Sequence, residues 1–223
     1  MIYHYMKGTI KKSIHHIAIV AGGTLSYAMK KRIKKASYVI GVDRGAYWLL
    51  ENHIIPDLAI GDFDSVSGRE LALIEKEVGI VEKHPKEKDV TDLELAIDHA
   101  CTLRPKTIEV FGVIGSRMDH TWAGIQLLQR IKSHNILGYI VDNFNEISLV
   151  SGFVSLHKSQ TYKYISFFPF HDRASVTLSG FRYNASRRVF VSGSSLGVSN
   201  EIVSSPAKVV IHDGMLLVVR SRD

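Results

Sequence analysis

Short apolar runs alternate with helical repeats over the first two-thirds of the chain. The runs are rich in valine and isoleucine, and turn-forming or polar residues bound each of them, which is typical of buried strands. We expect strands at His16–Ala21, Tyr38–Val42, Leu58–Gly61, Thr107–Val113 and Gly138–Asp142. Between them the apolar positions follow a helical period, and we expect helices up to about Lys35, over Ala46–Asn52, after Ser67, over 91–101 and over 119–131. Strands that alternate with helices predict an α/β fold in which helices cover both faces of a mainly parallel sheet.

Two of the expected helix starts carry a capping signal. Ser67 is followed by Glu70, and Thr91 is followed by Glu94. A hydroxyl at the first position accepts a hydrogen bond from the backbone three residues later, and the acidic side chain there can accept one in return. This spacing therefore marks the first turn of both helices.

After about residue 146 the helical period disappears, and short β-rich runs follow one another between Asn, Gly, Ser and Pro residues. We expect strands at Ile147–Val150, Tyr162–Phe168, Ser175–Ser179, Arg188–Val191, Lys208–His212 and Met215–Val219. Regularly spaced short strands predict an antiparallel sandwich or barrel. The chain is thus expected to have two domains, an α/β domain over 1–146 and an all-β sandwich domain over 147–223.

Composition narrows the class of protein. The 28 Lys and Arg residues exceed the 22 Asp and Glu residues, which gives a formal charge of +6, and 45% of the residues are hydrophobic. These values are ordinary for a folded domain and argue against disorder. A single cysteine, Cys101, excludes an intrachain disulfide framework and a multi-cysteine zinc site.

The sequence shows neither a membrane segment nor an export signal. No run reaches the length of about 18 apolar residues that a membrane helix needs. Met1–Ser13 is basic but lacks the apolar core and the cleavage site of a signal peptide. We therefore expect a cytoplasmic protein with no membrane partner.

Acidic residues follow the predicted parallel strands at the points where the strands end. Asp43, Asp62 and Asp64 come after the second and third strands, and Asp89 and Asp92 lie where the next long helix begins. Each alone is explained as a helix cap or as a complement to a helix dipole. Two carboxylates separated by one residue, however, repel each other unless a cation or a proton lies between them. The group therefore predicts an oxygen-rich Mg²⁺ site, and because Mg²⁺ usually accompanies phosphates, it predicts phosphate chemistry.

The common phosphate-binding fingerprints do not occur. Neither G-x-x-x-x-G-K-[ST] nor G-x-G-x-x-G is present, which argues against a P-loop enzyme and a dinucleotide-binding Rossmann domain. Gly22–Gly23 after the first strand can bring backbone N–H groups to a phosphate or simply form a turn. Arg117, two residues before Asp119, can neutralise phosphate charge, and so can Lys86 and Lys88 unless they only line a solvated loop.

Taken together, the motifs resemble the thiamine pyrophosphokinase family over nearly the whole chain. The segments that carry the resemblance are Gly41–Ala46 (GVDRGA), Pro56–Asp57, Gly61–Ser65 (GDFDS), Lys88–Glu94 (KDVTDLE), Gly115–His120 (GSRMDH) and Ser195–Asn200 (SLGVSN). The Asp-Phe-Asp-Ser and Asp-x-Thr-Asp motifs are specific in this order and spacing, and the Gly-Val-Ser-Asn motif in the second domain makes chance agreement improbable.

The resemblance implies a reaction and a set of site residues. The family transfers a pyrophosphoryl group from ATP to the hydroxyl of thiamine and releases AMP, and it implies a homodimer with active sites between the subunits and no nucleic-acid partner. By match to its motifs, Mg²⁺ and the triphosphate are expected at Asp62, Asp64 and Asp92. The same cleft is expected to be lined by Asp43, Thr91, Arg117 and Asp119. Thiamine is expected to contact Ser199 and Asn200.

Two positions depart from the family pattern. Gly124 stands where the family often carries an asparagine, so a polar contact from that position is lost. Tyr183, in Gly180–Tyr183, stands where some members have a tryptophan that stacks on the thiamine ring. Either Asp62 or Asp119 can accept the hydroxyl proton of thiamine, and the sequence does not choose between them.

Two alternative functions remain open at this stage. Asp62–Val66 also fits the D-x-D-x-[TV] loop of phosphatases that form an aspartyl-phosphate, although that loop usually follows the first strand and here follows the third. The basic charge also allows a non-catalytic protein that binds RNA or another polyanion, with Phe167, Phe168 and Phe170 as stacking platforms. These phenylalanines more often belong to a sandwich core.

Overall fold

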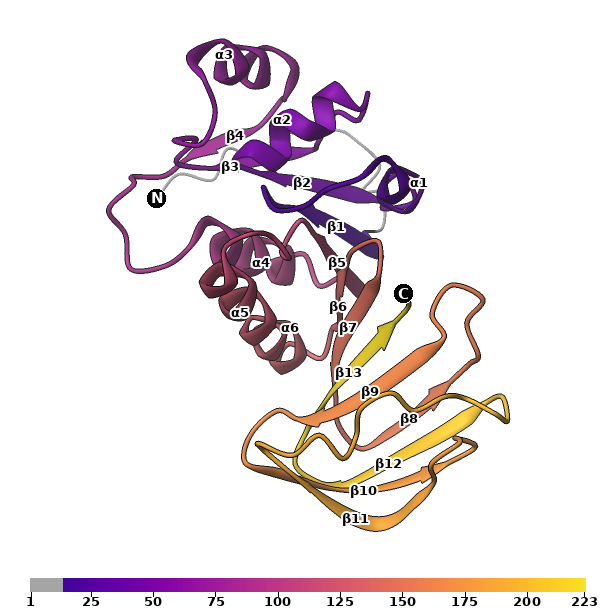
Figure 1. Cartoon of the computed structure of the whole chain (residues 1–223). Coiled ribbons are helices and arrows are strands. Elements are labelled where there is room, and N and C mark those ends of the chain that lie inside the picture. The colour runs from indigo at the N-terminus through magenta and orange to yellow at the C-terminus, as the bar shows by residue number, and fades with distance from the viewer. Residues whose placement is uncertain (1–13) are drawn as a thin grey trace.

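The computed structural model describes residues 14–223, and its largest element is a nine-stranded sheet (Figure 1). In order across the sheet, the strands are β4 (Val81–Lys83), β3 (Leu58–Gly61), β2 (Tyr38–Val42), β1 (His16–Val20), β5 (Thr107–Phe111), β6 (Leu137–Val141), β7 (Asn145–Val150), β13 (Leu216–Ser221) and β9 (Tyr164–Pro169). The strands from β4 to β6 are parallel, whereas β7, β13 and β9 are antiparallel to their neighbours. The carboxyl ends of the parallel strands therefore meet at one edge, where open sheets place their ligands.

Helices cover both faces of the parallel part. They are the 3₁₀ turn η1 (Tyr27–Met29), α1 (Lys30–Ile33), α2 (Arg44–Glu51), α3 (Gly68–Glu77), α4 (Asp92–Thr102), α5 (Met118–Gln126) and α6 (Leu128–Ser133). One face of the sheet packs against α4 and α6 through Ile97 and Ile131. The other packs against α1, α2 and α3 through Ile33, Leu49 and Ile74. Burial on both faces explains why β1, β2 and β3 are almost uniformly apolar.

The C-terminal part forms an antiparallel sandwich. Its second sheet contains β11 (Ala185–Val191), β10 (Arg173–Ser179), β12 (Ala207–Asp213) and β8 (Phe153–Leu156), in that order. Phe167 of β9 and Val218 of β13 pack against Val176 of β10 and Val209 of β12. The predicted fold class, a mainly parallel sheet flanked by helices followed by an all-β sandwich, is confirmed.

The sandwich shares three strands with the large sheet. β7 contains Glu146 and pairs with β6, so the sheet continues across the position where the sequence predicts a domain boundary. Leu216 and Val218 of β13 face the sandwich, whereas Leu217 and Val219 face the helical layer. Alternation along a strand lets β13 bury both faces in different cores. The division into 1–146 and 147–223 stays a prediction.

Several element boundaries differ from the sequence expectation. β4 and β8 were not expected, because both are short and partly exposed and carry no clear apolar run. The helix expected over 119–131 is divided at Leu127 into α5 and α6. The basic helix expected up to Lys35 is reduced to η1 and a single turn, α1. Ser67 and Thr91 are the N-caps of α3 and α4 as expected, but the full capping box forms only at Ser67 and Glu70, whereas at α4 only the bond to the Thr91 hydroxyl is present.

None of the helices in residues 14–223 has the length and the apolar character that crossing a bilayer requires. The expectation about Met1–Ser13 lies outside the described residues.

Candidate active site

Three carboxylates converge at the carboxyl edge of the parallel sheet. Asp43 follows β2, Asp62 follows β3, and Asp92 is the first residue of α4. One carboxylate oxygen from each residue lies within 4.8 Å of the other two, and all three side chains are partly buried. We call this group the acidic cluster. Because like charges so close together repel, the cluster requires a cation or a proton to be stable.

Asp43 occupies an unusual backbone position. Its φ of 48° lies in the region that disfavours side chains other than glycine, at the point where β2 turns into α2. Its Oδ1 accepts a hydrogen bond from the backbone N–H of Phe63 at 3.1 Å. Gly61 leaves room for this carboxylate, since a Cβ at Gly61 would lie 1.9 Å from Oδ1 of Asp43. The loop after β3 is therefore shaped around Asp43.

Burial and the neighbouring negative charges disfavour the ionised form of Asp43. Burial is the largest cause, and the charges of Asp92 and Asp62 add to it. Together they raise the pKa of Asp43 from 3.8 to about 6, although the hydrogen bond from Phe63 and the charge of Lys88 act in the opposite direction.

Lys88 supplies positive charge to the acidic cluster. Its Nζ lies 2.9 Å from Oδ2 of Asp92 and 3.9 Å from Oδ2 of Asp62, and only 13% of its side chain is exposed. Oδ1 of Asp92 is buried and has no hydrogen-bond partner in residues 14–223. Several carboxylate oxygens, one of them unpartnered, around a common point are a donor set that suits a divalent cation. The residues present therefore fit the metal that the sequence predicts.

Asp64 lies beside this group without joining its shortest contacts. Its backbone N–H donates to Oδ1 of Asp62 at 3.0 Å, but its carboxylate pairs with Nζ of Lys86 at 2.7 Å, and both of these side chains are exposed. The hydrogen bond from Lys86 lowers the pKa of Asp64. The convergent group thus contains Asp43, which the sequence predicted only to line the cleft. It does not contain Asp64, which the sequence predicted to bind the metal.

The other predicted lining residues lie at two helix starts. Thr91 is the N-cap of α4, Arg117 is the N-cap of α5, and Asp119 lies in the first turn of α5. Oγ1 of Thr91 accepts a hydrogen bond from the backbone N–H of Glu94 at 3.2 Å. Nη2 of Arg117 lies 2.5 Å from Oδ2 of Asp119, and both side chains are largely exposed. This hydrogen bond lowers the pKa of Asp119 to about 2. Within residues 14–223, neither Arg117 nor Asp119 forms an ion pair with the acidic cluster.

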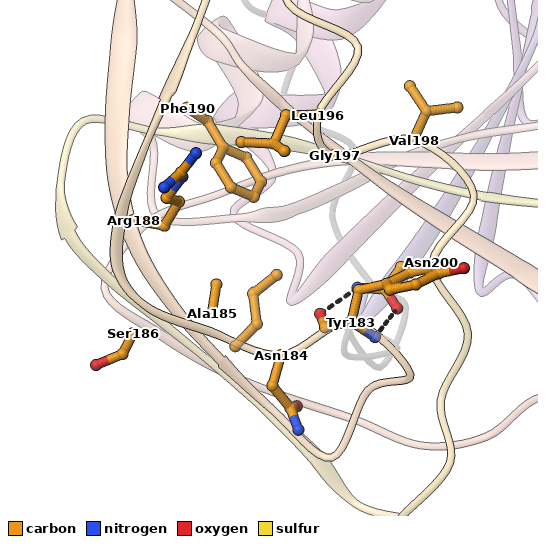
Figure 2. A pocket seen from close by; sticks show the side chains of 11 residues that line it. Tyr183, Asn184, Ala185, Ser186, Arg188, Phe190, Leu196, Gly197, Val198 and Asn200 are labelled. Atoms are coloured by element: carbon orange, nitrogen blue, oxygen red, sulfur yellow. Dashed lines mark hydrogen bonds between the residues drawn. The ribbon is translucent and has the colours of Figure 1, made fainter.

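A separate pocket of about 400 Å³ lies in the sandwich (Figure 2). Its walls come from β10, β11 and the loop that follows β11, and apolar side chains such as Phe190 and Leu196 line part of it. In Figure 2, Tyr183 and Asn200 lie next to each other, across the pocket from Phe190, and hydrogen bonds join them. Tyr183 is 62% exposed, so its ring is accessible at this pocket.

Asn200 fixes the backbone at Tyr183. Its Oδ1 accepts from the N–H of Tyr183 at 3.0 Å and from the N–H of Glu201 at 2.9 Å. Its Nδ2 donates to the carbonyl of Tyr183 at 2.8 Å. Asn200 is 4% exposed, whereas the neighbouring Ser199 is exposed and its N–H donates to Oγ of Ser166. The polar atoms of Asn200 are thus used within the chain, and they hold Tyr183 at the pocket.

Two family models cover most of the chain. "Thiamin pyrophosphokinase, catalytic domain" matches residues 29–140, which include the acidic cluster. "Thiamin pyrophosphokinase, vitamin B1 binding domain" matches residues 154–216, which include the sandwich pocket. The chain belongs to the thiamine pyrophosphokinase family. The two sites described above therefore fall one in each of the family's domains.

Individual relatives agree with this assignment. The thiamine pyrophosphokinase of Bacillus subtilis (strain 168) is 38% identical over 211 residues, which cover 93% of this chain and 99% of the relative. A crystal structure of the Bacillus subtilis enzyme superposes with a TM-score of 0.87 at 37% identity, with the same coverage of the two chains. The thiamin pyrophosphokinase of Geobacillus thermodenitrificans superposes with a TM-score of 0.84 at 32% identity, over 93% of this chain and 98% of the relative.

Membership of the thiamine pyrophosphokinase family disfavours the two alternative functions. Neither an aspartyl-phosphate phosphatase nor a polyanion-binding protein accounts for a chain matched in both parts by this family. The phenylalanines considered as stacking platforms are instead largely packed, since Phe167 lies in the sandwich core and Phe168 and Phe170 pack against the core of the large sheet.

The departure at Gly124 has a packing reason. Gly124 is buried where α5 meets the end of the loop after β5, and a Cβ there would lie 2.4 Å from Cγ1 of Val113. The same built Cβ would lie 3.5 Å from Cδ2 of Leu93, the residue after Asp92. A larger residue at this position would have to displace Val113, whereas its contact with Leu93 would be an ordinary one. Gly124 thus lets α5 pack closely against the loop after β5.

Proposed function

We propose that this chain catalyses the thiamine pyrophosphokinase reaction at the acidic cluster, with Mg²⁺ as the divalent cation. In this reaction the hydroxyl of thiamine attacks the β-phosphorus of ATP, a new P–O bond forms, and AMP leaves with the electrons of the broken bond. The observation that carries the proposal is the convergence of Asp43, Asp62 and Asp92 within a chain that matches both family models.

Asp62 and Asp92, together with Asp43 or Asp64, would hold the cation. The unpartnered Oδ1 of Asp92 and the raised pKa of Asp43 both support a positive charge at this point. When bound, Mg²⁺ neutralises charge on the phosphate oxygens. Lys88, which lies against Asp92 and Asp62, is available to bind a phosphate oxygen once the carboxylates have another counter-charge. Thr91 fixes the first turn of α4, on which Asp92 lies.

Arg117 and Asp119 have linked roles in this proposal. Arg117 is exposed and pairs with Asp119 in the absence of substrate. A guanidinium prefers bidentate contact with phosphate, so the triphosphate would draw Arg117 away from Asp119. Asp119 would then regain basicity, because its lowered pKa results mainly from the Arg117 hydrogen bond. Asp62 and Asp119 both remain candidates for accepting the hydroxyl proton of thiamine.

The sandwich pocket is proposed to bind thiamine. Its apolar walls and the accessible ring of Tyr183 suit a flat cationic heterocycle, which an aromatic face attracts. Asn200 would act by holding Tyr183, and the exposed Ser199 would be free to contact the ligand.

The separation of the two sites supports a homodimer. Figure 1 shows β10 and β11, which line the pocket, at one end of the molecule, whereas β3 lies toward the other end and α4, which carries Asp92, lies near the middle. Phosphoryl transfer requires the two substrates in contact. We therefore propose that the pocket of one subunit faces the acidic cluster of its partner. Exposed apolar side chains near the pocket, Val189, Val191, Leu196 and Val198, support a protein contact there.

Two further expectations remain proposals. We propose that the chain functions in the cytoplasm, as its single cysteine suggests. We also propose the functional division at 1–146 and 147–223, because the family models match on either side of residue 146.

Product analysis tests the reaction. Purified protein is mixed with ATP, Mg²⁺ and thiamine, and the nucleotides and thiamine esters are separated by chromatography. Thiamine diphosphate and AMP in equal amounts support the proposal. ADP as the nucleotide product, with thiamine monophosphate, would indicate γ-phosphoryl transfer and would contradict it.

Subunit complementation tests the shared site. One chain carries Asp92→Asn and the other Tyr183→Ala, and each is expected to be nearly inactive alone. In a mixed dimer, one of the two sites combines the intact cluster of one chain with the intact pocket of the other. Random mixing should therefore restore about a quarter of wild-type activity. No recovery in dimers shown to be mixed would mean that each chain forms its own site.

A further inference from the structure

His84 lies at the carboxyl edge of the sheet, directly after β4 and beside the end of β3 that leads into Asp62. β4 pairs with β3 in parallel register, with Ile60 opposite Glu82. The backbone N–H of His84 donates to the carbonyl of Gly61 at 2.9 Å, so the pairing continues past the end of β4. Two steps along this register from Ile60 and Glu82 bring His84 level with Asp62. The proline-containing loop that follows His84 leads to Lys88 and then to α4.

The side chain of His84 projects to the α4 side of the sheet. Side chains alternate along a strand, so His84 shares a face with Glu82 and not with Lys83. Ile60, opposite Glu82, packs in the cluster that includes residues of α4. Lys83, on the other face, pairs with Glu75 of α3. This is the face from which α4 presents Asp92.

An unpartnered nitrogen distinguishes His84. Four buried side-chain atoms in residues 14–223 have no hydrogen-bond partner: Nε2 of His16, Nε2 of His84, Oδ1 of Asp92 and Oε2 of Glu109. His16 and Glu109 face each other, since these two atoms are 3.2 Å apart. The remaining two atoms belong to His84 and Asp92, and both lie at the carboxyl edge. Buried polar groups without partners are costly, and they are concentrated where a ligand completes their hydrogen bonds.

We propose that Nε2 of His84 donates a hydrogen bond to a phosphate oxygen of the nucleotide bound at the acidic cluster. A phosphate suits this nitrogen better than the cation does, because Mg²⁺ prefers oxygen ligands and the convergent donor set is made only of carboxylates. The inference rests on the proposed reaction, since it needs a triphosphate at the cluster. His84 lies outside all the segments that resemble the family, so the sequence motifs do not point to it.

Three variants separate the hydrogen bond from packing. His84→Gln keeps an N–H group near the position of Nε2, whereas His84→Phe keeps a ring and removes the donor. His134→Gln is the matched control, because His134 is exposed and bonds to Arg130 of its own helix. KM for ATP and KM for thiamine are measured separately, and calorimetry gives the affinity for a non-hydrolysable ATP analogue with Mg²⁺.

His84→Phe is expected to weaken nucleotide binding at least tenfold in KM for ATP and in the analogue's Kd, with KM for thiamine within about twofold. His84→Gln should retain nucleotide affinity within about threefold of wild type. Unchanged nucleotide affinity in His84→Phe would overturn the proposal, as would equal loss for both substrates with a lower melting temperature. Wild-type protein that makes no thiamine diphosphate, or binds no nucleotide, would instead refute the proposed function.

Discussion

Nζ of Lys88 lies 2.9 Å from Oδ2 of Asp92, and both side chains are almost buried. In the protein without metal, this ammonium group offsets part of the repulsion within the acidic cluster. A divalent cation bound by the carboxylates would take over that role. The ion pair therefore links the stability of the fold to occupancy of the site.

Removal of the Lys88 charge should make folding dependent on the metal. In EDTA, Lys88→Met is expected to lose about 3 kcal/mol of unfolding free energy, because it leaves buried carboxylates unpaired. Adding Mg²⁺ should remove most of this loss. Lys86→Met is the matched control, and it should cost far less, since Lys86 and Asp64 form an exposed pair. Urea titration with and without Mg²⁺ measures both, and an equal loss in both buffers would contradict the expectation.

The raised pKa of Asp43 predicts a specific pH dependence. A carboxyl group whose pKa is higher in the folded state contributes stability that is present below its ordinary pKa and lost as the pH rises through the folded value. The wild type in EDTA should therefore lose stability relative to Asp43→Asn between pH 3.8 and about 6. We expect a difference of about 3 kcal/mol. Denaturant titrations across this pH range measure it, and parallel pH curves for the two proteins would show that Asp43 is not perturbed.

The hydrogen bonds of Asn200 predict an effect on thiamine alone. Asn200→Ala frees the backbone of Tyr183 and should raise KM for thiamine by roughly five- to tenfold, with KM for ATP little changed. Asn52→Ala serves as the control, because Asn52 makes a similar side-chain bond to the carbonyl of Trp48, outside the pocket. If both variants changed KM for thiamine equally, the effect would reflect general destabilisation.

An ion-pair network ties α1 to the middle of the large sheet. Arg32 donates to Oε1 of Glu109 on β5 and to Oε2 of Glu146 on β7, and both carboxylates are nearly buried. Arg32→Met should therefore cost about 3–5 kcal/mol of unfolding free energy. Arg32→Met combined with Glu109→Leu should recover part of this loss, since one unpaired charge is removed. Arg130→Met, which breaks pairs that are more exposed, should cost far less.

The sequence predicts the fold where local signals and burial agree. Strands such as β1 and β2 are buried on both faces, so their apolar runs are unmistakable, and the hydroxyl caps at Ser67 and Thr91 mark helix starts. The short strands β4 and β8 carry no such run. The sharing of β7, β9 and β13 between two layers depends on long-range pairing, which no local pattern reveals.

The sequence likewise predicts only part of the candidate site. The motifs locate the acidic residues, because carboxyl ends of parallel strands meet at one edge. They do not show that Asp43 turns into the cluster while Asp64 pairs with Lys86, since this depends on the backbone turn at Asp43 and on the space left by Gly61. The internal bonding of Asn200 and the unpartnered nitrogen of His84 likewise depend on neighbours distant in sequence.

The position of a bound divalent ion shows whether the acidic cluster is the reaction centre. Crystals grown with Mn²⁺ and a non-hydrolysable ATP analogue are measured at the manganese absorption edge. We predict an anomalous peak among the carboxylates of Asp43, Asp62 and Asp92, in contact with phosphate oxygens of the analogue. Bound nucleotide with its manganese peak elsewhere in the molecule would contradict the account.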